Sequence, residues 1–536
     1  MFDSEMQEAT SVVAALQQVI NGCITELRAT GGIDANQVVA YDLAHMASGV
    51  EASRSVLQYG SKGEYEARIA LSFIADVCAE VMSRSYGREK AWGLDPAKIH
   101  DLRHFVAKFH DPAFVAELAD HSGPSHLDED FELVRATFAR FAVEVIGPLA
   151  EDIHRNNLDV PENIISGLAE MGAFGLSIPE NYGGFASGSE NDYLAMVVAT
   201  EELSKASLAC GGSLITRPEI LARALLRGGT ERQKMYWLPK LANGEIMAGV
   251  AVTEPDFGSD VANLSTSATK CPGGWLINGV KTWCTFGARA DVLMVLARTD
   301  PDKSKAHRGL SLFVVPKPQG DGNGFEFTQD LSPSIEAPNG RMEGRPIHTI
   351  GYRGMHSYEI SIENWFVDED SLVGLTEGLG KGFYYQMEGF ENGRIQTAAR
   401  AVGIMQAAYD VASSYAQNRN VFGEPIINYQ LTKYKLGRMA AVIGASRQFS
   451  YQVASLMAKG EGALQASMVK AYVCRAAEWV TREAMQIHGG MGYAEEFAVS
   501  RYFVDARVLS IFEGADETLS LKVIARRLLE VGYNPH

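Results

Sequence analysis

A carboxylate near the end of the sequence has neighbours that suit acid–base chemistry. Glu513 follows Ile511 and Phe512 and precedes Gly514. Two bulky apolar neighbours would partly desolvate the carboxylate, which disfavours its charged form and moves its pKa toward the range of a general base. In isolation, an exposed glutamate at a helix start would have the same pattern. Glu513 is therefore a candidate base, and the residues around it must decide between the two interpretations.

The stretch before Glu513 favours the catalytic interpretation. Residues 486–493 read QIHGGMGY, and Arg501 and Asp505 follow before Glu513. Together these residues resemble the closing signature of acyl-CoA dehydrogenases, flavoenzymes that desaturate acyl thioesters between the α and β carbons. The resemblance implies that Glu513 removes the α-proton. It also implies that Gln486 and Gly490 belong to the FAD site.

Two motifs in the middle of the chain point to the same cofactor. Residues 252–260 read VTEPDFGSD and resemble the family's first flavin signature, and residues 281–285 read KTWCT and resemble the strand beside the isoalloxazine ring. A flavin needs hydrogen-bond donors at its polar edge and an aromatic wall on one face, although a lone tryptophan is more often a core residue. The positions that the resemblance assigns to FAD here are Thr253 and Ser259 for flavin or phosphate, Trp283 beside the ring and Thr285 near N5.

A third motif implies a contact between subunits. Arg419 and Phe422 lie in the sequence RNVFG, and Gln430 follows at the spacing by which family members reach the FAD diphosphate and adenosine of a neighbouring subunit. A guanidinium suits a diphosphate because it donates in a planar fork, whereas without the other motifs Arg419 would be an ordinary solvated charge. Arg394 matches an arginine that lies near the CoA and acyl end in relatives.

The identity of the acyl group depends mainly on segments that most family members lack. Residues 330–345 form an insertion relative to common family members. With residues 351–359 and the N-terminal extension, this insertion resembles family members that act on a short, branched substrate with a free carboxylate, and the resemblance implies (2S)-methylsuccinyl-CoA as substrate and mesaconyl-CoA as product. A carboxylate in a dry pocket must be paired, ideally with a forked arginine. Arg217 and Arg353 are the candidates, and a structural role for each remains open.

The resemblance also names an electron acceptor and leaves alternatives. The reduced flavin is expected to pass its electrons to electron-transferring flavoprotein. A dehydrogenase for another short or branched acyl-CoA, or an oxidase that uses oxygen, would share every flavin motif. A non-enzymatic DNA-binding homologue is a further alternative. The chain departs from the family pattern after Glu513, where Ala515 replaces the usual threonine and Asp516 and Glu517 replace uncharged residues.

The elements that must position these residues follow from length and pattern. A chain of 536 residues with 46% hydrophobic residues can bury several cores. We expect a multidomain, mainly α-helical protein with a central β-barrel domain, because helical spacing dominates except for short β-rich runs at 275–279, 292–297 and 310–315. The expected domains are an N-terminal helical extension (1–125), a helical domain (126–248), a β-barrel domain (249–368) and a C-terminal four-helix bundle (369–536).

The extension contains a possible internal repeat. When Gln37 is aligned with Gln430, eight residues are identical at one fixed offset, for example Tyr41 and Tyr434. Either an internal repeat or the chance agreement of two Ala-rich helices explains these identities. Family members with an extra helical domain are often dimers, because that domain covers the surface used in tetramers. We therefore expect a homodimer with the extension docked on the bundle, and a tetramer is the alternative.

Charge and cysteine content exclude several function classes. The formal net charge of −18 argues against nucleic-acid or anionic-membrane partners, which require basic surfaces. The six cysteines lack metal-binding spacing, so no metal site is expected, and they suit a reducing compartment. With an acidic start and no long apolar run, we expect a cytoplasmic protein.

Overall fold

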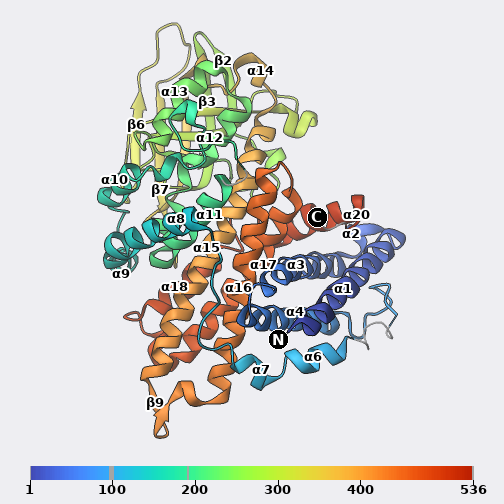
Figure 1. Ribbon diagram of the computed structural model, residues 1–536. Coiled ribbons are helices and arrows are strands. Elements are labelled where there is room, and N and C mark those ends of the chain that lie inside the picture. The colour runs from blue at the N-terminus through green and yellow to red at the C-terminus, as the bar shows by residue number, and fades with distance from the viewer. Residues whose placement is uncertain (1, 96–101, 190–191, 534–536) are drawn as a thin grey trace. The chain divides into compact units, whose positions relative to one another are not determined.

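The computed structural model describes residues 2–95, 102–189 and 192–533 (Figure 1). The chain forms two compact units, one from Met1–Thr137 with Arg394–His536 and the other from Phe138–Gly393. The boundaries fall inside two helices, α8 (Glu129–Phe141) and α15 (Gly382–Asn418). The two ends of the sequence therefore fold together, and the middle folds as a unit of its own. We call these the terminal unit and the middle unit.

The middle unit combines helices with a curled β-sheet. Besides short 3-10 turns and the shared helices α8 and α15, its described residues form a π-helix (Ala142–Ile146), α9 (Gly147–Asn156), α10 (Glu162–Glu170), α11 (Asp192–Ala206), a second π-helix (Leu208–Ser213), α12 (Arg217–Gly228), α13 (Glu231–Ala242) and α14 (Leu375–Gly378). Residues of α12, α13 and the sheet, among them Leu225, Leu238 and Met294, share one buried apolar cluster. Burial of these side chains holds the helices against the sheet.

The sheet supplies the rigid frame of the middle unit. Its strands are β1 (Ala248–Ala251), β2 (Ser267–Cys271), β3 (Gly274–Thr285), β4 (Val292–Arg298), β5 (Leu310–Pro316), β6 (Phe325–Gln329), β7 (Gly340–Ile347) and β8 (Ser357–Asp368). The order is β1-β4-β2-β3-β8-β7-β6, with β5 paired to β4. Strand β4 pairs in parallel with β1 and β2, and every one of its residues is buried. The three β-rich runs lie in β3, β4 and β5, so the expected mainly helical fold with a central β domain is confirmed.

The terminal unit is built from helices of very different lengths. They are α1 (Asp3–Ala29), α2 (Gly32–Ala35), α3 (Gln37–Gly60), α4 (Glu64–Ser85), α6 (Arg103–Phe109), α7 (Pro112–Ala116), α16 (Gln430–Ala458), α17 (Ala463–Ile487), α18 (Ala498–Val508), α19 (Asp516–Thr518), a π-helix (Leu519–Ala525) and α20 (Arg526–Val531). Helix α3 packs against α1, α4, α16 and α17 (Figure 1). The expected docking of the extension on the C-terminal helices is confirmed. Within the described residues, no helix combines the length and apolar character that crossing a membrane requires.

The two helices of the possible repeat occupy comparable positions. Helices α3 and α16 begin at the aligned residues Gln37 and Gln430, and a second long helix follows each of them. Five of the identical pairs are buried in both helices, among them Leu43 and Leu436, Met46 and Met439, and Ala47 and Ala440. The identities therefore lie largely on packed faces, where size and apolar character are constrained. This placement supports a repeat, which stays a prediction.

Candidate active site

Glu513 lies in a tight turn after α18. Its backbone φ is 52°, a left-handed conformation that costs a residue other than glycine roughly 1–3 kcal/mol and persists only when neighbouring contacts impose it. The N–H of Asp516 donates to the carbonyl of Ser510 at 3.1 Å and closes the turn. The Lys470 Nζ, which is buried, donates to the carbonyl of Gly514 at 2.7 Å. Burial lowers the pKa of Lys470.

The side chain of Glu513 has specific partners. The Thr397 hydroxyl donates to Oε2 at 2.6 Å, and Arg400 Nη2 donates to Oε1 at 3.0 Å. The Glu513 side chain is 10% exposed and that of Arg400 is fully buried. The carboxylate is thus largely removed from water, as its apolar neighbours suggest, but a buried cation accompanies it, and such a cation favours a charged carboxylate. The Arg400 guanidinium also lies 5.3 Å from the ring centroid of Phe512.

Sequence reasoning did not identify Thr397, Arg400 or Lys470. Arg394, Thr397 and Arg400 follow one another at intervals of three residues on α15. Residues at this spacing lie on the same side of a helix. Arg394 Nη1 donates to the Ser467 hydroxyl on α17 at 3.1 Å. The signal in the sequence was a row of polar residues at helical spacing in an Ala-rich helix, which is also common on solvated helix surfaces.

In the middle unit, Trp283 is presented outward by a break in the strand. The register between β3 and β8 shifts between Lys281 and Cys284, and Trp283 has a φ of 57° and is 56% exposed. Core packing therefore does not explain this tryptophan. Two residues on, the Thr285 hydroxyl lies 3.2 Å from that of Ser357. A bulge that turns an indole to the surface beside hydroxyl groups provides the donors and the aromatic wall that a flavin needs.

The loop that carries Thr253 and Ser259 is held by a buried ion pair. Lys281 Nζ donates to Glu254 Oε1 at 2.8 Å, and both side chains are almost fully buried. Glu254 also accepts from the N–H groups of Ser265 and Thr266. Burial would raise the pKa of Glu254, but Lys281 and the other donors outweigh it and lower the pKa to about 2. Thr253 is half-buried and Ser259 is exposed, so the anchored loop leaves both accessible.

The motif that implies a subunit contact forms a projecting hairpin. Strands β9 (Asn420–Val421) and β10 (Glu424–Pro425) pair across a two-residue turn, and its first residue, Phe422, has a φ of 52° and is 96% exposed. Arg419 and Gln430 flank the hairpin and are also exposed. Gln486 and Gly490 are exposed near the end of α17. A projecting, nearly bare phenylalanine suits contact with another molecule.

The two arginines proposed for the substrate carboxylate differ in their contacts. Arg353 donates to the backbone carbonyls of Thr349 at 3.1 Å and His154 at 2.9 Å, which favours a structural role. Arg217 is 5% exposed at the start of α12, where its Nε donates to the carbonyl of Ser213 at 3.2 Å. The Ser213 hydroxyl hydrogen-bonds Tyr352, whose φ is 60°. Arg217 therefore belongs to a buried polar cluster beside a π-helix, a distortion frequent at functional sites.

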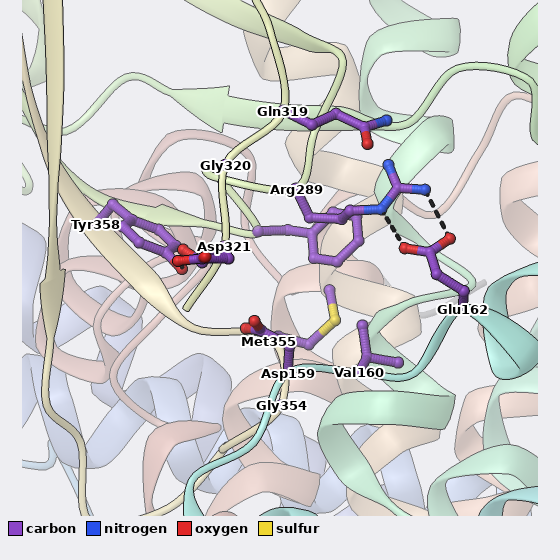
Figure 2. Close-up of a pocket in the computed structure, with 11 residues that line it drawn as sticks. Asp159, Val160, Glu162, Arg289, Gln319, Gly320, Asp321, Gly354, Met355 and Tyr358 are labelled. Carbon is purple, nitrogen blue, oxygen red and sulfur yellow. Dashed lines mark hydrogen bonds and ion pairs between the residues drawn. The ribbon is translucent and has the colours of Figure 1, made fainter. Parts of the chain in front are cut away.

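A separate pocket of about 250 Å³ lies in the middle unit (Figure 2). Its lining includes Arg289, whose guanidinium is engaged by Glu162 at 2.5 and 2.9 Å, together with Asp159 and Asp321. The acidic lining and the paired arginine do not suit an anionic CoA ester. The pocket includes Phe286, the neighbour of Thr285, but its lining contains none of the residues proposed for FAD or substrate.

The predicted site residues thus divide between the units. Thr253, Ser259, Trp283, Thr285, Arg217 and Arg353 lie in the middle unit, and Glu513, Arg394, Arg419, Phe422, Gln430, Gln486 and Gly490 lie in the terminal unit. Within the terminal unit, two site features contact α17: Lys470 bonds the carbonyl of Gly514, the neighbour of Glu513, and Ser467 accepts from Arg394. Within the middle unit, the exposed indole and the buried Arg217 cluster are separate features.

Comparison with known proteins decides the family. Models of the N-terminal, middle and C-terminal domains of acyl-CoA dehydrogenases match residues 128–245, 249–365 and 380–529. The chain belongs to the acyl-CoA dehydrogenase family. It is therefore an FAD-dependent acyl-CoA dehydrogenase, an oxidoreductase. The expectation drawn from the motifs is confirmed, whereas the role of each residue remains a proposal.

Individual relatives add detail. The (2S)-methylsuccinyl-CoA dehydrogenase of Cereibacter sphaeroides is 37% identical, with 98% of this chain and 97% of the relative covered. A glutaryl-CoA dehydrogenase solved in complex with glutaryl-CoA matches with a TM-score of 0.67 and 29% identity, covering 77% of this chain and 98% of that one. A structure described as the electron transferring flavoprotein of Acidaminococcus fermentans matches with a TM-score of 0.67 and 29% identity, and the match covers 75% of this chain and 98% of that one. The similarity to the first relative thus includes the N-terminal extension.

Proposed function

We propose that this acyl-CoA dehydrogenase desaturates a short, branched acyl-CoA that carries a free carboxylate, with (2S)-methylsuccinyl-CoA as substrate and mesaconyl-CoA as product. The observation behind this proposal is the buried Arg217 guanidinium, which lies in the helix that lines the acyl pocket of relatives. A guanidinium donates in a planar fork that matches a carboxylate, so Arg217 is a candidate to pair with the free carboxylate of such a substrate. The full-length similarity to a methylsuccinyl-CoA dehydrogenase supports the same substrate.

In the proposed reaction Glu513 removes the α-proton of the thioester. Arg400 and Thr397 orient its two carboxylate oxygens. The left-handed backbone at Glu513 aims the side chain, and the N–H of that residue is a candidate donor to the thioester carbonyl, which would stabilise the developing enolate charge. Arg217 would fix the far end of the acyl group by pairing with its carboxylate. A base oriented by fixed donors loses little entropy on reaching the reactive geometry.

The chain's residues fit the cofactor that the family requires. FAD would be held by the loop of Thr253 and Ser259, by Trp283 and Thr285, and by Gln486 and Gly490, with Arg419, Phe422 and Gln430 reaching a neighbouring subunit. The exposed indole at the β3 bulge supports this assignment, because an unburied tryptophan beside hydroxyl groups matches a flavin face. Bound there, the flavin supplies the acceptor for the hydride that leaves the β-carbon.

Electrons would pass to electron-transferring flavoprotein. The similarity to a chain in an electron-transferring flavoprotein structure supports this partner. The six cysteines, all within the described part of the chain, form no disulfide with one another, which supports a reducing compartment such as the cytoplasm. An acyl-CoA oxidase, or a dehydrogenase for another short or branched acyl-CoA, is the alternative function.

Turnover of a panel of substrates tests the proposal. Methylsuccinyl-CoA, butyryl-CoA and isobutyryl-CoA are compared as purified substrates, each with and without an electron-transferring flavoprotein. We expect methylsuccinyl-CoA to have the highest kcat/KM and turnover to require the flavoprotein. A preference for butyryl-CoA or isobutyryl-CoA would assign the enzyme to an uncharged substrate. Rapid turnover with oxygen alone would identify an oxidase.

We also propose a homodimer. The exposed hairpin of Phe422 and Arg419 supports this proposal, because it suits contact with a neighbouring subunit. Helices α3 and α4 already pack on α16, a surface that would otherwise be open to join two dimers. Light scattering should give a mass near twice the chain mass of 58.3 kDa. Replacing Phe422 by serine should weaken the dimer and lower its FAD content. A mass near four times that of the chain would support the tetramer instead.

A further inference from the structure

The extension contacts the segment that directly follows Glu513. From α3, the Tyr41 hydroxyl donates to Asp516 Oδ2, and His45 Nε2 lies 3.1 Å from the same oxygen. His45 is 2% exposed and Asp516 is 8% exposed. The Ser520 hydroxyl lies 3.2 Å from His45 Nε2. Asp516 is one of the positions at which this chain departs from its family, and its partners on α3 explain why a carboxylate can be buried there.

The protonation states agree with this arrangement. Burial would raise the pKa of Asp516, but the hydrogen bonds from His45 and Tyr41 outweigh it and hold the pKa below its usual value. Burial lowers the pKa of His45. At neutral pH an ionised Asp516 therefore accepts from the phenol of Tyr41 and from a neutral imidazole.

Asp516 is coupled directly to the turn of Glu513. The backbone N–H of Asp516 closes that turn on Ser510, while Lys470 holds the carbonyl of Gly514. The left-handed Glu513 lies inside the loop that the first bond closes and directly before the carbonyl that Lys470 holds. Such a backbone persists only where its surroundings impose it. Releasing the Asp516 side chain would loosen the first bond and let the carboxylate of Glu513 move.

We propose that Tyr41 and His45 are positioning residues for Glu513, so that the N-terminal extension sets the geometry of the base. This inference rests on the proposed role of Glu513. It assigns the extension a part in the chemistry that is separate from any role in assembly. Misplacing a reacting group by about 1 Å can cost on the order of 10²-fold in rate.

A double-mutant cycle tests the inference on the full-length enzyme. Tyr41→Phe should lower kcat roughly 10- to 100-fold and leave KM and FAD content unchanged. In a Glu513→Gln background the same substitution should have no further effect, because the group it positions is gone. Exchange of the substrate α-proton with deuterated solvent should fall in parallel. An equal loss of kcat in both backgrounds, or a change in KM alone, would overturn the proposal.

Two further comparisons separate positioning from general stability. Tyr533, which follows α20, donates to Glu51 of α3 at 2.6 Å. Tyr533→Phe removes this other contact of α3 with the C-terminal segment and should leave kcat unchanged. His45→Gln retains an N–H donor and should keep most of the activity, whereas His45→Leu should lose it. Equal activity of the two His45 variants would contradict the proposal. A fully active Glu513→Gln enzyme would instead refute the assigned base, a different result from failure of the cycle.

Discussion

Glu513→Gln should lower desaturation about 10²- to 10⁴-fold and leave a yellow, FAD-loaded protein. The amide keeps the shape of the side chain and can still accept from Thr397, but it cannot take up the α-proton. Steady-state turnover and the flavin absorbance of the purified variant are the two measurements. The substitution also removes the counter-charge 3.0 Å from the buried Arg400, so we expect a lower unfolding temperature.

Glu517, four residues after Glu513, offers a matched control for the Glu513→Gln variant. Glu517 is exposed in the same segment, and Glu517→Gln removes an equal charge without touching the turn. It should have wild-type turnover. Activity of Glu513→Gln within tenfold of wild type would move the role of base to another carboxylate.

Arg217→Met should change the choice of substrate. If Arg217 pairs the acyl carboxylate, its loss leaves that charge buried and unpaired, at a cost of about 3–5 kcal/mol. The kcat/KM for methylsuccinyl-CoA should therefore fall by about 10²- to 10⁴-fold, since each 1.36 kcal/mol or so is a factor of ten, while that for butyryl-CoA changes far less. The ratio of the two constants is the measurement, because it cancels any general loss of folded enzyme.

Arg353→Met is the control for this experiment. Arg353 donates to two backbone carbonyls, so its loss should lower stability and affect both substrates equally. If Arg217→Met also reduced both substrates to the same extent, Arg217 would be structural and the substrate carboxylate would need another partner.

The sequence was informative where the signal is local. The helices at α3 and α4, the strands β3, β4 and β5, and the motifs around Trp283 and Glu513 all follow from neighbouring residues. The family could also be predicted from short local motifs. All of these predictions rest on periodicity or on a short run of residues, and none of them depends on residues far away in the sequence.

The partners of Glu513 could not be predicted in this way. Arg400 and Thr397 lie 113 and 116 residues before Glu513 in the sequence. Their helix has a pattern of polar residues that suits a solvated face equally well. Asp516 was an unexplained departure from the family, because its partners Tyr41 and His45 come from the other end of the chain. Tertiary packing supplies such contacts, and no local pattern indicates them.

The contacts between α3 and the C-terminal segment also have a consequence for biosynthesis. His45 meets Asp516 across 471 positions of the sequence, and Glu51 meets Tyr533 across 482. Contacts between such distant residues close a very large loop and form late in folding. On the ribosome, these two residues of α3 emerge more than 470 residues before their partners Asp516 and Tyr533. The face of α3 that contacts them therefore stays uncovered until these partners emerge, and a nascent chain that stalls before Glu513 exposes that face while it still lacks the base.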